Sequence, residues 1–256
     1  MTLKIHGYPG AISTQRVINI CHELELDYTF ILVDFKTSAQ RSPEYLALQP
    51  FGKVPLLEDD GFFVHESRAI CKYLAIQYAT RKCKLIPNQK ETKDYALFEQ
   101  VSLQNQDSVD KEISGELKKY RLTLHRPAQL KLNISMAQWQ ESVTRSSSNR
   151  TIQFKSFLFL GTLLIINRRR GINGDEAVIS KLTATLETVL AAYETILAKQ
   201  NYLAGHEVTL ADLYHLPYGT LTKSLGFAEM FSRFPHVNEW FDGLSRRQSW
   251  VKTVQE

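Results

Sequence analysis

The order of elements along the first 80 residues constrains the fold more than any other feature of the chain. An apolar run over residues 3–7 predicts a strand, and apolar residues at helical spacing from Val17 to Leu24 predict a helix. Residues 28–35 are β-branched and aromatic, which favours a second strand. The chain therefore begins as strand, helix and strand.

The following residues predict a second unit with a different order. Residues 42–48 indicate a short helix, with Ser42 as its N-cap and Pro43 at its first position. Two short apolar runs around the sequence Asp-Asp-Gly at residues 59–61 indicate a hairpin. Residues 66–79 again have helical spacing. The order helix, strand, strand and helix completes an α/β domain.

The remainder of the chain is helical by pattern. Helical spacing is strong over residues 175–200, and Thr209 and Asp212 stand in capping-box spacing where another helix begins. A polar stretch with one proline separates this part from the first domain. We expect an α/β domain over residues 1–82, a linker over residues 83–94 and an all-helical domain over residues 95–256.

Charge, cysteine content and hydropathy indicate a cytoplasmic protein. A total of 31 Lys and Arg against 27 Asp and Glu leaves a net charge of +4, which is typical of a mixed solvated surface, so no nucleic-acid partner is expected. Three cysteines without CxxC spacing indicate reduced thiols in the cytosol. The first residues lack the apolar region of a signal peptide. The most apolar stretch, residues 157–166, is about half of a membrane span, so no membrane partner is expected.

Three longer motifs carry a resemblance to a known family. They are SPEYLALQPFGKVPLLEDD at residues 42–60, HESRAICKYLA at residues 65–75 and NYLAGHEVTLADLYHLPY at residues 201–218. With them the chain resembles the cytosolic glutathione transferases, and their phi class of plants and fungi most of all. The resemblance covers residues 1–120 and about 171–256, and it implies an α/β thioredoxin-like N-terminal domain plus an all-α C-terminal domain.

The resemblance also implies a site for glutathione, a tripeptide with two carboxylate ends and one thiol. A cis peptide bond at Val54-Pro55 would turn the backbone of Val54 toward the ligand, where its N–H and C=O can pair with the cysteinyl residue as an added strand would. Glu66 and Ser67 begin a helix, and the family uses this pair for the γ-glutamyl end. The carboxylate meets the amine there, while the hydroxyl and the helix N-terminus meet the α-carboxylate.

Polar side chains beside the short helix are expected to bind the glycyl carboxylate. The family places basic or polar residues before the SPE motif, and here those positions hold Gln40 and Arg41. Lys53 stands where the family commonly has a glutamine, and an ammonium group can also donate to a carboxylate. Each side chain alone would be typical of a solvated surface. Their joint occurrence, in this order, favours a glutathione site.

The hydroxyl that should activate the thiol is absent from its family position. The activating serine of the family lies four residues after the glycine that ends the first strand, and counting from Gly7 that position is Ala11. Ser13 and Thr14 follow two and three residues later, and they are the candidates to replace it, with Ser13 first. Either hydroxyl could instead cap the helix, and the sequence does not decide between the two roles.

The activity implied by the resemblance is attack by the glutathione thiolate on a small hydrophobic electrophile. Glutathione is then the co-substrate, and no metal is implied. Ile12 and residues near 98–106 are the candidate wall of the electrophile site. A homodimer is also implied, with Phe51 near the partner subunit, and the alternative for Phe51 is packing within its own chain.

Two other classes of function stay open. A binding protein would hold glutathione or hydrophobic ligands without turnover, which the missing hydroxyl at Ala11 allows. An interaction module would be similar to the transferase-like domains of translation-elongation and nitrogen-regulator proteins. The intact VP and ES motifs disfavour the second alternative.

Residues 121–170 do not fit the pattern on either side of them. They contain Pro127, the tract TRSSSNRT and the apolar run at residues 157–166, with no sustained helical period. One explanation is a lineage-specific insertion that forms a lid over the electrophile site. The other, which the disordered mixture of residue types favours, is translated non-coding sequence from a retained intron.

Overall fold

The computed structural model describes residues 3–80, 83–104 and 176–256 of the chain. The described residues divide into two units, one that contains those up to 102 together with 190–256 and one that contains 103–104 and 176–189. The first unit holds the described strands and most of the described helices. The segment at residues 121–170, for which the sequence leaves both an insertion and translated non-coding sequence open, lies outside the described residues.

A four-stranded mixed sheet forms the base of the first unit. Its strands are β1 (Leu3–Gly7), β2 (Thr29–Leu32), β3 (Leu56–Asp59) and β4 (Phe62–His65). The spatial order is β2-β1-β3-β4. β1 pairs in parallel with β2 and antiparallel with β3, and β3 forms an antiparallel hairpin with β4. The two predicted units, strand–helix–strand and hairpin, are therefore confirmed.

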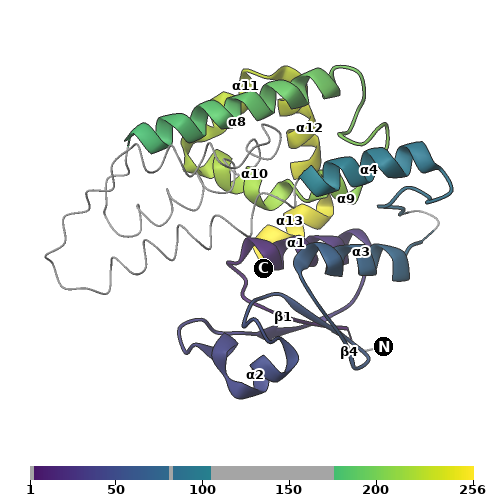
Figure 1. The fold of residues 1–256 in the computed structure, drawn as a ribbon, viewed down its shortest axis with the longest axis vertical. Helices are drawn as coiled ribbons and strands as arrows, with labels where there is room; N and C mark the ends of the chain where they lie inside the picture. Colours follow the sequence, from purple (N-terminus) through teal and green to yellow (C-terminus); the bar gives the residue numbers. More distant parts are fainter. Residues whose placement is uncertain (1–2, 81–82, 105–175) are drawn as a thin grey trace, which may run out of the picture. The chain divides into compact units, whose positions relative to one another are not determined.

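Helices cover both faces of the sheet (Figure 1). They are α1 (Ile12–Glu23) and α3 (Ser67–Gln77) on one face, and α2 (Pro43–Leu48) with the short 3-10 turn η1 (Ala39–Arg41) on the other. Ile20 of α1 and Ile70 of α3 are fully buried, as apolar residues at helical spacing require. On the opposite face, Tyr45 of α2 packs with Leu56 of the sheet. Ser42 caps α2 as predicted, because its hydroxyl accepts from the Tyr45 backbone N–H over 3.2 Å.

The described elements of the second half are helices, apart from one isolated β-bridge between Tyr202 and Gly205. This confirms the helical pattern of the described part of that half. None of the helices in the described ranges is long and apolar enough to cross a membrane. The helices are α4 (Thr92–Gln104), α8 (Glu176–Leu197), α9 (Leu210–Leu213), α10 (Leu216–Thr222), the π turn η2 (Lys223–Phe227), α11 (Ala228–Ser232), α12 (Pro235–Ser245) and α13 (Gln248–Gln255).

The three cysteines are free thiols, as predicted. Cys21 on α1 and Cys71 on α3 are fully buried, while Cys83 is half-buried. Burial raises the pKa of Cys71 to about 12, and burial also raises the pKa of Cys21. Both buried thiols therefore stay protonated and pack as small apolar groups.

A buried carboxylate organises the start of α9. Asp212 is fully buried, and its oxygens accept from the backbone N–H of Leu203 at 2.9 Å, from the backbone N–H of Thr209 at 3.0 Å and from Trp240 Nε1 at 3.1 Å. The Thr209 hydroxyl also donates to Asp212 over 3.0 Å. The predicted capping box is therefore confirmed, and the same carboxylate ties α9 to a loop and to α12.

A buried histidine lies next to this network. Nδ1 of His215 lies 2.8 Å from the backbone oxygen of Ala211, to which it donates, so Nε2 at 3.1 Å from the Tyr193 hydroxyl serves as the acceptor. Burial lowers the pKa of His215 to about 3. The imidazole is therefore neutral in the folded protein at neutral pH.

This depressed pKa predicts a loss of stability in acid. In the unfolded chain a histidine binds its proton near pH ~6.5, whereas folded His215 stays neutral down to about 3. Between these values the unfolded state binds more protons, so the free energy of unfolding falls as the pH is lowered, by about 1.4 kcal/mol per pH unit for one proton. Urea denaturation between pH 4 and 7 measures this slope.

The variant His215→Asn isolates the contribution of the histidine. Asn has a donor for Ala211 and an acceptor for Tyr193, but it does not titrate. The buried Asp212 carboxyl, whose pKa burial raises, acts in the opposite direction but is present in both proteins. We expect the free energy of unfolding of the variant to depend less steeply on pH, by the amount that corresponds to about one bound proton. Identical slopes would show that His215 does not titrate on unfolding.

Candidate functional site

Strand register gathers the predicted site residues at one end of the sheet. His6 of β1 and His65 of β4 both lie opposite Leu56, the first residue of β3. The segments that follow β1, precede β3 and follow β4 must therefore lie close together. These segments are the loop into α1, the Val54-Pro55 pair and the start of α3.

The Val54-Pro55 peptide bond is cis, as predicted. The hydroxyl of Ser13, in the first turn of α1, donates to the backbone oxygen of Val54 over 3.1 Å. Both residues are half-buried. A peptide ligand that pairs with the backbone of Val54 would therefore place its own side chain near the Ser13 hydroxyl.

Thr14, the second candidate hydroxyl, faces the interior instead. Its side chain is fully buried, and its Oγ1 accepts from the Tyr8 backbone N–H over 3.4 Å. Its methyl group packs so closely on Gly7 that a Cβ there would lie only 2.5 Å from it. Thr14 therefore supports the turn between β1 and α1, and Ser13 is the hydroxyl that faces the cis-proline segment.

The start of α1 is open to an anion. Ala11 is its N-cap residue, and among the described residues no side chain caps this helix. Its first turn also has no acidic residue. The partial positive charge of a helix N-terminus stabilises a nearby negative charge by about 0.3–1 kcal/mol, and by up to ~2 kcal/mol in partly buried geometry. A thiolate beside Ser13 would benefit from this field.

Glu66 and Ser67 stand at the start of α3, as the sequence predicted. Glu66 is the N-cap residue with φ +71°, a conformation that costs free energy for a residue with a side chain. The carboxylate of Glu66 is exposed, whereas Ser67 is buried and its hydroxyl oxygen accepts from Arg16 Nη1 over 2.7 Å. The pair thus presents an anion and a hydroxyl at a helix N-terminus.

The three polar residues expected at the glycyl end lie around one glycine. Gly52 has a φ of +59° and packs closely on the η1 turn. A Cβ at this position would lie 2.6 Å from the backbone oxygen of Gln40 and 3.0 Å from Arg41 Nη1. Lys53 follows directly, and its backbone oxygen accepts from the Tyr45 hydroxyl over 2.7 Å. The structure therefore brings Gln40, Arg41 and Lys53 to one place beside the cis proline.

The remaining predicted residues have more varied surroundings. Ile12 is half-buried at the first position of α1, where it can contact a ligand of the site. Phe98 is fully buried, so it is a core residue rather than a wall of the electrophile site, and residues 105–106 lie outside the described residues. Phe51 is 60% exposed, and its ring lies at a steep angle to the His65 ring with centroids 5.6 Å apart, so one part of it packs within its own chain and the rest faces outward.

Sequence reasoning missed three residues near the site. Arg16 of α1 contacts Ser67, although the sequence offered only its place in the Arg16-Val17 pair. Tyr8 stacks on the exposed Phe35, with ring centroids 5.1 Å apart. No local pattern signals either contact, because the first depends on how α1 packs beside α3 and the second on how the loop after β1 meets the segment after β2.

Comparison with known families accounts for this arrangement. Residues 1–76 match the glutathione S-transferase N-terminal domain, and residues 154–248 match the glutathione S-transferase C-terminal domain. The chain belongs to the glutathione S-transferase family. The C-terminal match begins inside residues 121–170, so the stretch without family resemblance ends earlier than the sequence predicted.

Relatives from fungi and plants align along almost the whole chain. Glutathione S-transferase hmp2 of Hypomyces subiculosus is 35% identical over 261 residues, covering 100% of this chain and 99% of that protein. Glutathione S-transferase PM239X14 of Arabidopsis thaliana is 32% identical, covering 94% and 90%. The predicted likeness to phi-class transferases is confirmed.

Solved structures of glutathione S-transferases share the fold. Glutathione transferase F7 from Populus trichocarpa superposes with a TM-score of 0.73 at 27% identity, covering 99% of this chain and 98% of its own. Maize glutathione S-transferase I, in complex with an atrazine glutathione conjugate, also gives a TM-score of 0.73, at 25% identity and with 99% and 96% covered. The predicted thioredoxin-like and all-α architecture is confirmed.

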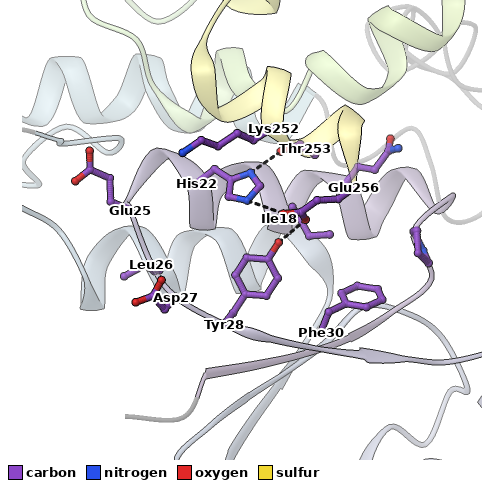
Figure 2. Close-up of a pocket in the computed structure, with 12 residues that line it drawn as sticks. Ile18, His22, Glu25, Leu26, Asp27, Tyr28, Phe30, Lys252, Thr253 and Glu256 are labelled. Atoms are coloured by element: carbon purple, nitrogen blue, oxygen red, sulfur yellow. Dashed lines mark hydrogen bonds and ion pairs between the residues drawn. The ribbon is translucent and has the colours of Figure 1, made fainter.

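A cavity of about 830 Å³ lies elsewhere, between α1, the segment leading into β2, and α13 (Figure 2). None of the predicted site residues lines it. His22 contacts the Thr253 hydroxyl at 3.1 Å and the Glu256 carboxylate at 3.2 Å, and Tyr28 donates to Glu256 over 2.6 Å. These polar groups form hydrogen bonds and an ion pair with one another. They therefore connect the C-terminal segment to α1 and do not indicate a ligand site.

Proposed function

We propose that this protein is a glutathione transferase that joins the glutathione thiolate to small hydrophobic electrophiles, in a detoxification role. The observation that carries this proposal is the Ser13 hydroxyl, 3.1 Å from the Val54 backbone oxygen beside the cis proline. Val54 is positioned to align the cysteinyl residue, Glu66 and Ser67 to hold the γ-glutamyl end, and Gln40, Arg41 and Lys53 to hold the glycyl carboxylate. The family supports the same assignment.

Chemistry at this site requires a thiolate, because the thiolate and not the thiol attacks an electrophile. A free thiol titrates near pKa ~8.5, and lowering that pKa by two units takes about 2.7 kcal/mol of preferential thiolate stabilisation. The α1 N-terminus supplies up to ~2 kcal/mol. A hydrogen bond from a hydroxyl to a charged group adds about 1.5–3 kcal/mol. The single proton of Ser13 is donated to the Val54 oxygen in the free protein, so it must turn to the thiolate when glutathione binds. With that exchange, Ser13 and the helix together provide the stabilisation that populates the thiolate at neutral pH.

A glutathione-binding protein without turnover is the second candidate function. The observation that favours it is Ala11, which places a methyl group at the N-cap of α1 where the family has its activating hydroxyl. Such a protein would use the same anchoring residues. It would lack the preferential stabilisation of the thiolate.

Two measurements separate these functions. A glutathione-affinity column tests retention, and a chloronitrobenzene substrate tests thiol conjugation through the absorbance of its product. Retention with turnover supports the transferase, and retention without turnover supports the binding protein. The absence of both would leave the interaction module.

Domain limits and location belong to the same proposal. We place the glutathione-binding domain at residues 1–82, the linker at residues 83–94 and the helical domain at residues 95–256. The three free thiols support a cytoplasmic location.

A homodimer is supported by large apolar side chains that remain exposed around the hairpin and α3, namely Phe51, Phe62, Phe63 and Ile76.

Removal of the Phe51 ring is expected to weaken the dimer. Phe51→Ser should raise the dimer dissociation constant roughly 30-fold, since the loss of one buried aromatic anchor costs about 2 kcal/mol. Leu32→Ser is the matched control, because Leu32 is 59% exposed and lies on the edge strand β2. Light scattering across a dilution series measures both variants. Equal effects of the two substitutions would remove Phe51 from the interface.

A further inference from the structure

Arg16 places a positive charge in the interior of the first unit. Its side chain is only 4% exposed, and its guanidinium carbon lies 5.7 Å from the ring centroid of Tyr214 and 5.7 Å from that of Tyr218. Within the described part of the chain, its Nε has no hydrogen-bond partner and no carboxylate forms an ion pair with it. Burying a charge without a counter-anion is costly. An anionic ligand nearby would offset that cost.

The contact between Arg16 and Ser67 defines what the serine can do. Nη1 of Arg16 donates to Ser67 Oγ over 2.7 Å. A hydroxyl has one proton and two acceptor lone pairs, so the donation by Arg16 leaves the Ser67 proton to point elsewhere. A charged donor also polarises the hydroxyl and makes it a stronger donor in turn. Ser67 is thereby prepared to donate to a carboxylate.

A second guanidinium group extends the positive region. The guanidinium carbon of Arg68 lies 5.6 Å from the centroid of the same Tyr214 ring. Burial, and after it the charge of Arg16, lowers the pKa of Arg68 to about 10. Two cations therefore lie near one aromatic ring at the start of α3, where a carboxylate would be stabilised.

We propose that Arg16 is a positioning residue for the γ-glutamyl α-carboxylate of glutathione and acts through the Ser67 hydroxyl. This inference rests on the glutathione transferase function proposed above. Ser13 and Arg16 lie about one turn apart on α1, and they contact Val54 and Ser67 respectively. One helix thus sets the groups that hold two different parts of the tripeptide.

Calorimetric titration with two ligands tests the proposal. The first ligand is glutathione, and the second is 4-aminobutanoyl-cysteinyl-glycine, which lacks only the γ-glutamyl α-carboxylate. Arg16→Met should raise the Kd of glutathione about tenfold and leave the Kd of the second ligand within about twofold. The KM for glutathione should rise by a similar factor, while kcat at saturating glutathione stays nearly unchanged. The double variant Arg16→Met/Ser67→Ala should bind glutathione no more weakly than Ser67→Ala alone.

Matched variants keep the test decisive. Arg247→Met removes another arginine that contacts α1, through hydrogen bonds of 2.5 and 2.6 Å to Glu23, and should leave the glutathione Kd unchanged. If Arg16→Met does not fold, Arg16→Lys can be used, because it keeps the positive charge but lacks the planar guanidinium group. This variant should raise the Kd of glutathione about threefold and leave the Kd of the second ligand unchanged. Unchanged glutathione affinity, or equal losses for both ligands, would overturn the role of Arg16 and leave the proposed function intact. A natural chain that binds neither ligand would overturn both.

Discussion

Asp212→Ala is expected to lower the free energy of unfolding by about 4 kcal/mol or more. The substitution removes the acceptor for Trp240 Nε1 and for the backbone N–H groups of Leu203 and Thr209. Each buried donor left without a partner costs about 1–3 kcal/mol. The free energy of unfolding of an ordinary domain is about 5–15 kcal/mol, so this loss would remove a large part of it. Thermal and urea denaturation measure the change, and a low soluble yield is the expected first sign.

Two control variants define the source of this loss. Asp212→Asn keeps one acceptor oxygen, but its amide group meets donors, so an intermediate loss is expected. Asp242→Ala removes a carboxylate that is 43% exposed and paired with Lys223, which should cost less than about 1 kcal/mol. An Asp212→Ala protein as stable as the Asp242→Ala protein would contradict the assignment.

Ser13→Ala is expected to reduce kcat/KM more than tenfold with little change in glutathione affinity. The hydroxyl stabilises the thiolate over the thiol, so its removal should raise the pKa of the bound thiol by about one unit for every 1.4 kcal/mol lost. Ultraviolet absorption of the thiolate, followed against pH in the binary complex, measures this pKa. The rate of conjugation should follow the thiolate fraction.

Thr14→Val and Ala11→Ser test whether the effect belongs to position 13. Thr14→Val keeps the shape of the buried side chain and should leave the thiol pKa unchanged, although the Tyr8 N–H loses its acceptor. Ala11→Ser in the Ser13→Ala background restores a hydroxyl at the family position and should recover activity. Full activity in Ser13→Ala alone would transfer the role to the backbone amides of α1.

The sequence was sufficient to predict the parts of the site that short motifs encode. The helix start at Ser67 depends on neighbouring residues, as does the capping box of Asp212 in the helical part, whereas the cis bond at Val54-Pro55 is implied by the family resemblance, and each is confirmed. The burial of Thr14 could also have been predicted from the sequence. Thr14 lies three residues before Val17 and seven before Cys21, both buried, so helical periodicity already placed it on the inner face.

Other features depend on contacts between distant segments and could not be predicted. Arg16 and Ser67 are 51 residues apart, and their hydrogen bond requires α1 and α3 to pack side by side on the sheet. Phe98 was expected near a ligand because helix α4 carries it, yet the rotation of that helix buries it completely. The sequence gives the apolar character of such a residue but not what it faces.

The burial of the cysteines affects how readily the electrophilic substrates of such a protein would alkylate its own thiols. An electrophile that reacts with glutathione alkylates protein thiols by the same route, and only as thiolates. Cys21 and Cys71 are buried and their pKa values are raised, so in the folded protein both are poor targets for such reagents. Cys83 is the more accessible thiol, and partial burial raises its pKa as well. Two of the three protein thiols therefore compete poorly with glutathione for reactive compounds, and Cys83 is the one that remains partly accessible.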